Sequence, residues 1–145
     1  MLPPITAAHL VGWDLETELL PRLEASLGRA LLKNAGRFAA HDYRGADETR
    51  GALDVELKTR PAYDRRGNLQ HPGRFDTWLV PSCKIKNAET RPLTIFYYYK
   101  ADDSLWRLDY EEKLFASFER ECPSWHPTKQ EHLLIPATVW TKVEV

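Results

Sequence analysis

The spacing of apolar residues predicts a long amphipathic helix near the start of the chain. Leucine recurs at every fourth position over residues 15–31, which forms one apolar stripe on a helix. Asp14 suits the N-cap of this helix, and Gly36 would end it. Pro21 either kinks the helix or begins a second one. Residues 1–13 contain two consecutive prolines and are expected to form an extended lead-in.

Farther along, period-two alternation and clusters of β-branched and aromatic residues predict strands. Strands are expected at 38–43 and 52–59, with a polar hairpin turn at 45–51 between them. The clearest strand is 93–100, and 105–110 returns as its hairpin partner. The other predictions are a loop at 61–74, a helix or strand at 75–86, a short helix at 111–120, a strand at 132–135 and a final turn or short helix from Pro136. This order predicts an α/β fold with a central mixed β-sheet flanked by helices.

Composition agrees with one domain over residues 1–145, with 43% hydrophobic and 28% charged residues. No apolar run approaches the roughly 20 residues of a membrane span, and the N-terminal residues lack the pattern of a signal peptide. The two cysteines, Cys83 and Cys122, favour free thiols in a reducing compartment, with a single disulfide as the alternative. We therefore expect a soluble intracellular protein of the cytoplasm or nucleus, with no membrane partner.

Charge is balanced overall and uneven along the chain. Twenty Lys and Arg residues stand against 21 Asp and Glu residues, for a net charge of −1. This balance argues against a protein that coats nucleic acid with its whole surface, because such binding needs excess positive charge. Residues 58–74, however, hold five Lys or Arg residues and one Asp, which predicts a local basic patch.

One predicted strand carries three charged residues on the same face, because Asp54, Glu56 and Lys58 alternate along it. A half-solvated strand with a polar face in water would explain them. The hairpin also places Asp42 opposite residues 54–56 of the neighbouring strand, where facing Cβ atoms are about 5 Å apart. Two carboxylates at that range repel unless a cation lies between them, and such oxygen ligands suit Mg²⁺.

The same residues resemble the signature of the PD-(D/E)XK nuclease superfamily, whose fold is restriction-endonuclease-like. That signature is an acidic residue, a gap across a hairpin, and (D/E)-x-K on the next strand. Here Asp42 is followed, after thirteen residues, by Glu56-Leu57-Lys58. The order of a Glu-bearing helix, this hairpin and a later strand pair is similar over residues 14–110.

The flanking sequence, with His41 before Asp42, is similar to that of small nuclease-like proteins of phages and large DNA viruses; a viral member would act in a host cell. His41 stands where the family name has a proline, and Asp54 competes with Asp42 as the first acid. We prefer Asp42, because the family places its first acid on a separate strand or turn.

The resemblance implies a metal-dependent nuclease of the endo- or exodeoxyribonuclease type. Asp42 and Glu56 would hold one or two Mg²⁺ ions, with Mn²⁺ as an alternative, and the Leu57 carbonyl would be a third ligand. Lys58 would orient the attacking water or help to deprotonate it. The resemblance also implies that a helical glutamate, Glu16 or Glu18, would complete the metal shell or position water, with a solvated helix residue as the alternative. Asp54 would be an extra outer carboxylate.

Basic residues close to the motif suit a DNA phosphate backbone. Arg60 continues the charged face of the motif strand and is the strongest candidate. The other candidates are Arg65, Arg66, Arg74 and Lys84, with a solvated loop as the alternative for the arginines. Cleavage of both strands of a duplex usually needs two active sites. We therefore also expect a homodimer or an assembly partner.

Two other groups of residues are given structural interpretations. The tryptophans are expected to pack in the core rather than stack on bases; they include Trp78, Trp106, Trp125 and Trp140. A zinc site is not expected, because paired ligand spacing is missing among Cys83, Cys122, His126 and His132.

Two alternatives to an active enzyme follow from the same residues. One is a catalytically inactive module of the same fold that binds nucleic acid or a partner protein in a viral, phage or repair assembly. The other is a structural protein whose charged strand face is only solvated.

Overall fold

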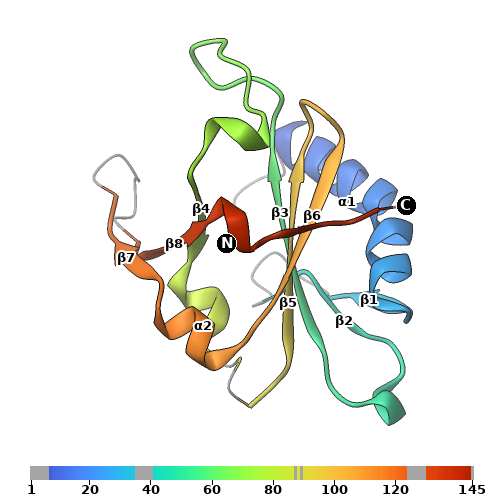
Figure 1. Cartoon of the computed structure of the whole chain (residues 1–145). Helices are drawn as coiled ribbons and strands as arrows, with labels where there is room; N and C mark the ends of the chain where they lie inside the picture. The colour runs from blue at the N-terminus through green and yellow to red at the C-terminus, as the bar shows by residue number, and fades with distance from the viewer. Residues whose placement is uncertain (1–6, 35–40, 87, 89, 124–129, 145) are drawn as a thin grey trace, which may run out of the picture.

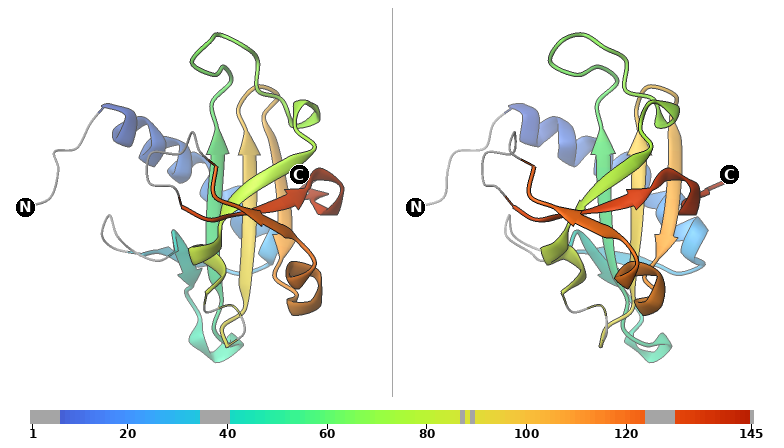
Figure 2. Two further views of the ribbon diagram at one scale, coloured as in Figure 1. Left: turned by 90° about the vertical axis from the view of Figure 1, so that its left-hand side faces the viewer. Right: turned by 60° about the vertical axis from the view of Figure 1, so that its left-hand side comes forward.

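A computed structural model describes residues 7–34, 41–86, 88, 90–123 and 130–144, arranged in three layers. Helix α1 (Ala7–Leu27) covers one face of a six-stranded sheet, and a three-stranded sheet crosses the other face (Figures 1 and 2). The central sheet has the order β1 (Leu31–Lys33), β2 (Tyr43–Gly45), β3 (Asp54–Arg60), β5 (Leu93–Tyr99), β6 (Ser104–Asp109) and β9 (Thr141–Lys142). The second sheet has the order β4 (Thr77–Pro81), β8 (His132–Pro136) and β7 (Glu119–Glu121).

The central sheet is mixed, because β3 and β5 run parallel and the other paired strands run antiparallel. This confirms the predicted α/β class with a central mixed sheet. Short helical segments join the strands: η1 (Glu48–Arg50), η2 (Pro72–Arg74), η3 (Ser82–Ile85), α2 (Glu112–Ala116) and η4 (Ala137–Val139). The layer that the sequence did not predict is the second sheet, which packs where helices were expected.

Helix α1 begins earlier than the sequence predicted. Its first residue is Ala7, so the expected extended lead-in over 1–13 is wrong for residues 7–13, and Asp14 lies inside the helix rather than at its N-cap. The two prolines restrict only the residues next to them, whereas the alanines that follow are strong helix formers. Pro21 lies within one continuous helix.

The helix also ends earlier than predicted. Gly28 has φ +64°, and its N–H donates to the Glu24 carbonyl at 2.9 Å, which closes the last turn. Such a left-handed glycine is a common helix terminator. Leu31, the last leucine of the stripe, therefore belongs to β1, and Gly36 lies outside the described residues.

The strand predictions have mixed outcomes. The pair at 93–100 and 105–110 is confirmed as β5 and β6. The segment 75–86 contains both a strand and a 3-10 helix, β4 and η3. The predicted strand at 38–43 contributes only its last residue to β2, and positions 35–40 lie outside the described residues.

Two apolar clusters cover the two faces of β3 and β5. On the α1 side, Leu19 and Leu23 pack against Val55 and Leu57. On the other side, alternate residues of β5, among them Ile95 and Tyr97, pack against Trp78 and the apolar residues of β8. Core packing is confirmed for Trp78 and Trp140, which are buried, and for Trp106, which packs against them; Trp125 lies outside the described residues. Among the described helices, none is both long and apolar enough to cross a membrane.

Candidate active site

Strand β3 presents its apolar and charged residues to different layers. Val55 and Leu57 point toward α1, whereas Glu56 and its period-two neighbours share the face covered by the second sheet. Asp54 is 8% exposed and Glu56 is 3% exposed. The half-solvated strand is therefore wrong for these two residues. A wet face is expected only where nothing packs on a sheet, and here β4 and β8 pack on it.

Glu56 lies at the centre of a charged cluster. Its Oε1 atom is 3.7 Å from Nζ of Lys58 and 3.6 Å from Nζ of Lys84, which comes from η3. Its Oε2 atom is 3.4 Å from Nδ1 of His41. A carboxylate this buried is costly unless cations or hydrogen bonds compensate it. The two lysines supply that compensation. Their two positive charges exceed the single negative charge of Glu56, which leaves a net positive charge at this point.

One oxygen of this buried carboxylate is incompletely satisfied. Within the described part of the chain, Glu56 Oε2 and His41 Nδ1 are buried atoms that make no hydrogen bond. Buried acceptors are normally paired with protein, water or an ion. The unsatisfied oxygen is therefore a point where a cation would fit.

Asp42 directly precedes β2 and contacts β3, the strand that carries Glu56. Tyr43 pairs with Val55, so extending the register by one residue places Asp42 opposite Glu56. Asp42 Oδ2 accepts a hydrogen bond from the Leu57 N–H at 2.8 Å. The N–H and C=O of one strand residue point to the same edge, so the Leu57 carbonyl also lies on the Asp42 edge.

Asp54 has a different environment. Both of its carboxylate oxygens accept bonds from Arg91, from Nε at 2.9 Å and from Nη2 at 3.0 Å. This two-point pairing is a strong, oriented interaction and explains how Asp54 is buried. The sequence pattern missed Arg91, which precedes β5 and reaches Asp54 across the parallel pair. The geometry thus favours Asp42 over Asp54 as the partner of Glu56.

Glu18, one of the two candidate helical glutamates, does not join this cluster. Glu18 is exposed on α1 and lies near Tyr98, whose pKa is raised to about 12 by burial, by its bond to Asp103 and by the charges of Asp103 and Glu18. Tyr98 belongs to the cluster on the α1 side of the sheet, whereas Glu56 points to the opposite side. The side chain of Glu16 lies outside the described residues.

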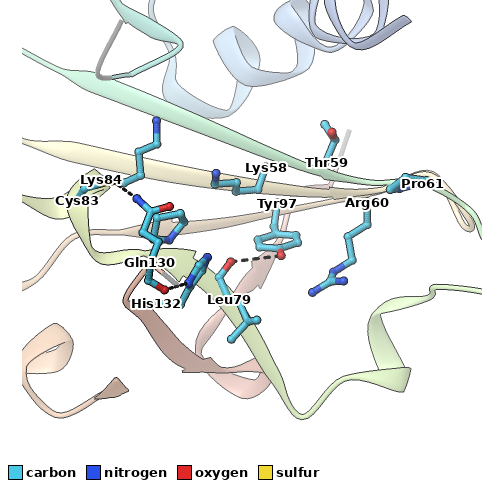
Figure 3. A pocket seen from close by; sticks show the side chains of 11 residues that line it. Lys58, Thr59, Arg60, Pro61, Leu79, Cys83, Lys84, Tyr97, Gln130 and His132 are labelled. Atoms are coloured by element: carbon cyan, nitrogen blue, oxygen red, sulfur yellow. Dashed lines mark hydrogen bonds between the residues drawn. The ribbon is translucent and has the colours of Figure 1, made fainter. Parts of the chain in front are cut away.

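A basic pocket of about 600 Å³ opens between β3 and the second sheet (Figure 3). Its cationic lining residues are Lys58, Arg60 and Lys84, and Tyr97 and His132 also face it. Burial raises the pKa of Tyr97, so its phenol is neutral near pH 7 and donates to the Leu79 carbonyl at 3.4 Å. The Tyr97 hydroxyl proton is therefore already used within the protein, and the pocket offers a ligand mainly positive charge, which suits a phosphate group.

The predicted phosphate-binding residues divide into three groups. Lys84 and Arg60 line the pocket, and the Arg60 guanidinium lies over the Phe75 ring at 4.2 Å. Arg65 and Arg66 are exposed on the loop after β3. Arg74 donates to Asp64 at 2.9 Å and so closes that loop.

The remaining sulfur and imidazole groups are scattered around this region. Cys83 and Cys122 are exposed free thiols, and Cys83 accepts a bond from Gln130 at 3.0 Å. His132 is buried, and His126 lies outside the described residues. Within the described ranges, no group of three or more His, Cys, Asp or Glu side chains has an arrangement that would hold a metal ion. An ion at Glu56 would therefore depend on few protein ligands, as Mg²⁺ often does when water and substrate complete its shell.

The comparisons with known proteins give a structural relative. Neither a family model nor a curated protein sequence matches the chain. Its fold is similar to the solved structure of a nuclease from a fusselovirus, with a TM-score of 0.50 and 14% sequence identity. The likeness covers 97% of this chain and 89% of the viral protein. The chain thus shares its overall fold with a viral nuclease.

Proposed function

We propose that this protein is a metal-dependent nuclease that hydrolyses DNA phosphodiester bonds. The observation that carries the proposal is Glu56, a buried carboxylate paired with Lys58 and Lys84, two lysines that line a basic pocket. A glutamate is rarely buried this fully unless it is paired, so its placement beside two lysines supports a functional role. The fold shared with a viral nuclease supports the same reaction class.

The donors around Glu56 suit a hard divalent cation. Asp42 and Glu56 would hold Mg²⁺ or Mn²⁺, with the Leu57 carbonyl on the same edge of β3 as Asp42. The unsatisfied Oε2 of Glu56 is the observation that fits such an ion. When bound, the ion would lower the pKa of a water molecule and neutralise charge on the phosphate.

The other residues would position the substrate. Lys58 contacts Glu56 and lines the pocket, so it is placed to orient a water molecule between the carboxylate and a phosphate. Arg60 and Lys84, which also line the pocket, would bind phosphate oxygens.

The test is cleavage of plasmid DNA and of single-stranded, duplex and branched oligonucleotides, with Mg²⁺, with Mn²⁺ and with EDTA. We expect metal-dependent cleavage by the wild type, and a loss of at least roughly 100-fold in Glu56→Gln and Lys58→Ala. Lys113→Ala, an exposed lysine on α2, is the matched control and should cleave normally. Equal cleavage by wild type and both site variants would refute the assignment.

Calorimetric titration with Mn²⁺ separates the enzyme from an inactive module of the same fold. Binding that is lost in Glu56→Gln supports the enzyme. Retained DNA binding without any uptake of metal would instead favour the module.

A further inference from the structure

The loop that follows β3 is an ordered arm, here defined as residues 61–71, which extends beyond the end of β3 (Figure 1). Asp64 organises its turn, because Oδ1 accepts the N–H groups of Arg66 and Asn68, each at 2.9 Å. Gly67 has φ +81°, a conformation that glycine adopts without strain, and its N–H donates to the Asp64 carbonyl at 3.0 Å. The arm is therefore a folded hairpin.

This arm carries two apolar side chains on one face. Tyr63 and Leu69 form an antiparallel bridge, and residues directly opposite each other in such a bridge share a face. Tyr63 is 62% exposed and Leu69 is 45% exposed. Among the described residues, the other large hydrophobic side chain exposed to this degree is Leu32, which lies on β1. A rigid hairpin that presents adjacent apolar side chains is typical of a contact surface.

The base of the arm is fixed to the wall of the basic pocket. Gln70 is buried, and its amide donates to the Pro61 carbonyl at 3.1 Å while its oxygen accepts from Arg60 at 3.4 Å. Arg60 and Pro61 both line the pocket. The position of Tyr63 relative to the pocket is therefore set by the fold.

Charge identifies the class of partner. Arg65 and Arg66 are exposed at the turn, and Lys58 and Arg60 stand at its base. Arg74 and Asp64 neutralise each other. The surface thus offers positive charge next to an aromatic and an aliphatic side chain. A matching partner would be a polyanion that also exposes planar apolar groups. Nucleic acid exposes such groups where bases are unstacked, at single strands and at the ends or forks of a duplex.

We infer that the arm is a wedge for forked DNA. In this arrangement Tyr63 stacks on the last base pair of the duplex, with Leu69 beside it, and one unpaired strand passes from the fork into the basic pocket. The inference rests on the proposed function, because it assigns the pocket to a DNA strand. It adds the substrate class, a junction between double-stranded and single-stranded DNA.

The experiment measures binding without metal, so it does not depend on cleavage. Fluorescence anisotropy in EDTA gives the Kd of a labelled fork, and competition with closed circular duplex DNA gives the affinity for uninterrupted duplex. We expect Tyr63→Ala to weaken fork binding roughly 5- to 100-fold, the range for loss of one base–aromatic stack. Affinity for the circular duplex should not change, and Tyr63→Phe should bind the fork normally.

Leu32→Ala is the matched control, since Leu32 is 46% exposed and lies on another part of the molecule. A fork with 2-aminopurine in its last base pair reports stacking directly, and its fluorescence should respond to the wild type and not to Tyr63→Ala. An equal loss for fork and circle, no loss for the fork, or an unchanged 2-aminopurine signal overturns the wedge. These outcomes leave the cleavage test of Glu56→Gln unaffected, so the two proposals fail separately.

Discussion

Lys84 Nζ lies 3.6 Å from Oε1 of Glu56, the same oxygen that Lys58 Nζ approaches to 3.7 Å. Lys84 belongs to η3, directly after β4, so this contact joins the second sheet to the charged face of β3. One carboxylate oxygen thereby holds two ammonium groups from separate layers. Both lysines line the pocket, and either could hold the phosphate of a substrate.

Lys84→Ala should reduce cleavage by roughly 100-fold, because it removes one cation from a preorganised phosphate site. The double variant Lys58→Ala/Lys84→Ala should lose less than the product of the two single effects, since both lysines share one oxygen of Glu56. Single-turnover cleavage rates of the four proteins form the double-mutant cycle. Lys113→Ala is the control, and strictly multiplicative losses would show that the lysines act independently.

Asp42→Asn and Asp42→Ala should separate the two roles of Asp42. Asparagine keeps an oxygen that accepts the Leu57 N–H, so its free energy of unfolding should stay within about 1 kcal/mol of the wild type. Alanine leaves that N–H without its acceptor and should cost about 1–2 kcal/mol more. Both variants should lose Mn²⁺ binding by calorimetry, because neither carries the carboxylate. Mn²⁺ binding retained by Asp42→Asn would remove Asp42 from the metal site.

The hairpin that carries the site was predictable because its information is local. Alternation over 53–58 fixes which residues share a face, and the turn at 45–51 fixes the register that brings Asp42 opposite Glu56. A run of β-branched and aromatic residues also identified β5, and the turn after it identified β6 as its hairpin partner; the aromatic residues of β5 fill both faces of the sheet.

The rest of the site depends on contacts between residues distant in sequence. Nothing in the pattern around Asp54 shows that Arg91 will pair with it, or that Lys84 will reach Glu56. The Arg91 pairing requires the parallel β3–β5 pair, and the Lys84 pairing requires the packing of the second sheet; local periodicity specifies neither. The burial of Glu56 follows from the packing of the second sheet. The alternation of charged residues along β3 suggests a solvated face, but that face is covered by the second sheet.

Arg91→Ala tests whether Asp54 is structural. Removal of the guanidinium leaves the Asp54 carboxylate, 8% exposed, without its two-point partner, which should lower the free energy of unfolding by about 1–3 kcal/mol. Urea denaturation measures this loss. Cleavage by the folded variant should remain near the wild-type rate, because Asp42 and Glu56 are unchanged. A loss of cleavage as large as that of Glu56→Gln, at full stability, would instead place Asp54 in the active site.

The arm should loosen in acid, because its turn depends on an ionised Asp64. The hydrogen bond from the Asn68 N–H, followed by the bond from Arg74, holds the pKa of Asp64 below the 3.8 of a free aspartate. A carboxyl group whose pKa is lower in the folded state stabilises that state above its unfolded pKa. This contribution is lost as the pH falls from about 3.8 through the folded value.

The amide protons of Arg66 and Asn68 report this titration directly, because both donate to Asp64 Oδ1. Their NMR shifts should move with a midpoint below pH 3.8 in the wild type and stay flat in Asp64→Asn. Trypsin at pH 8 gives a second measurement, since Asp64→Ala should be cut faster after Arg65 and Arg66 once the turn is opened. A midpoint at or above 3.8, or equal cutting of the two proteins, would show that Asp64 does not hold the arm in shape.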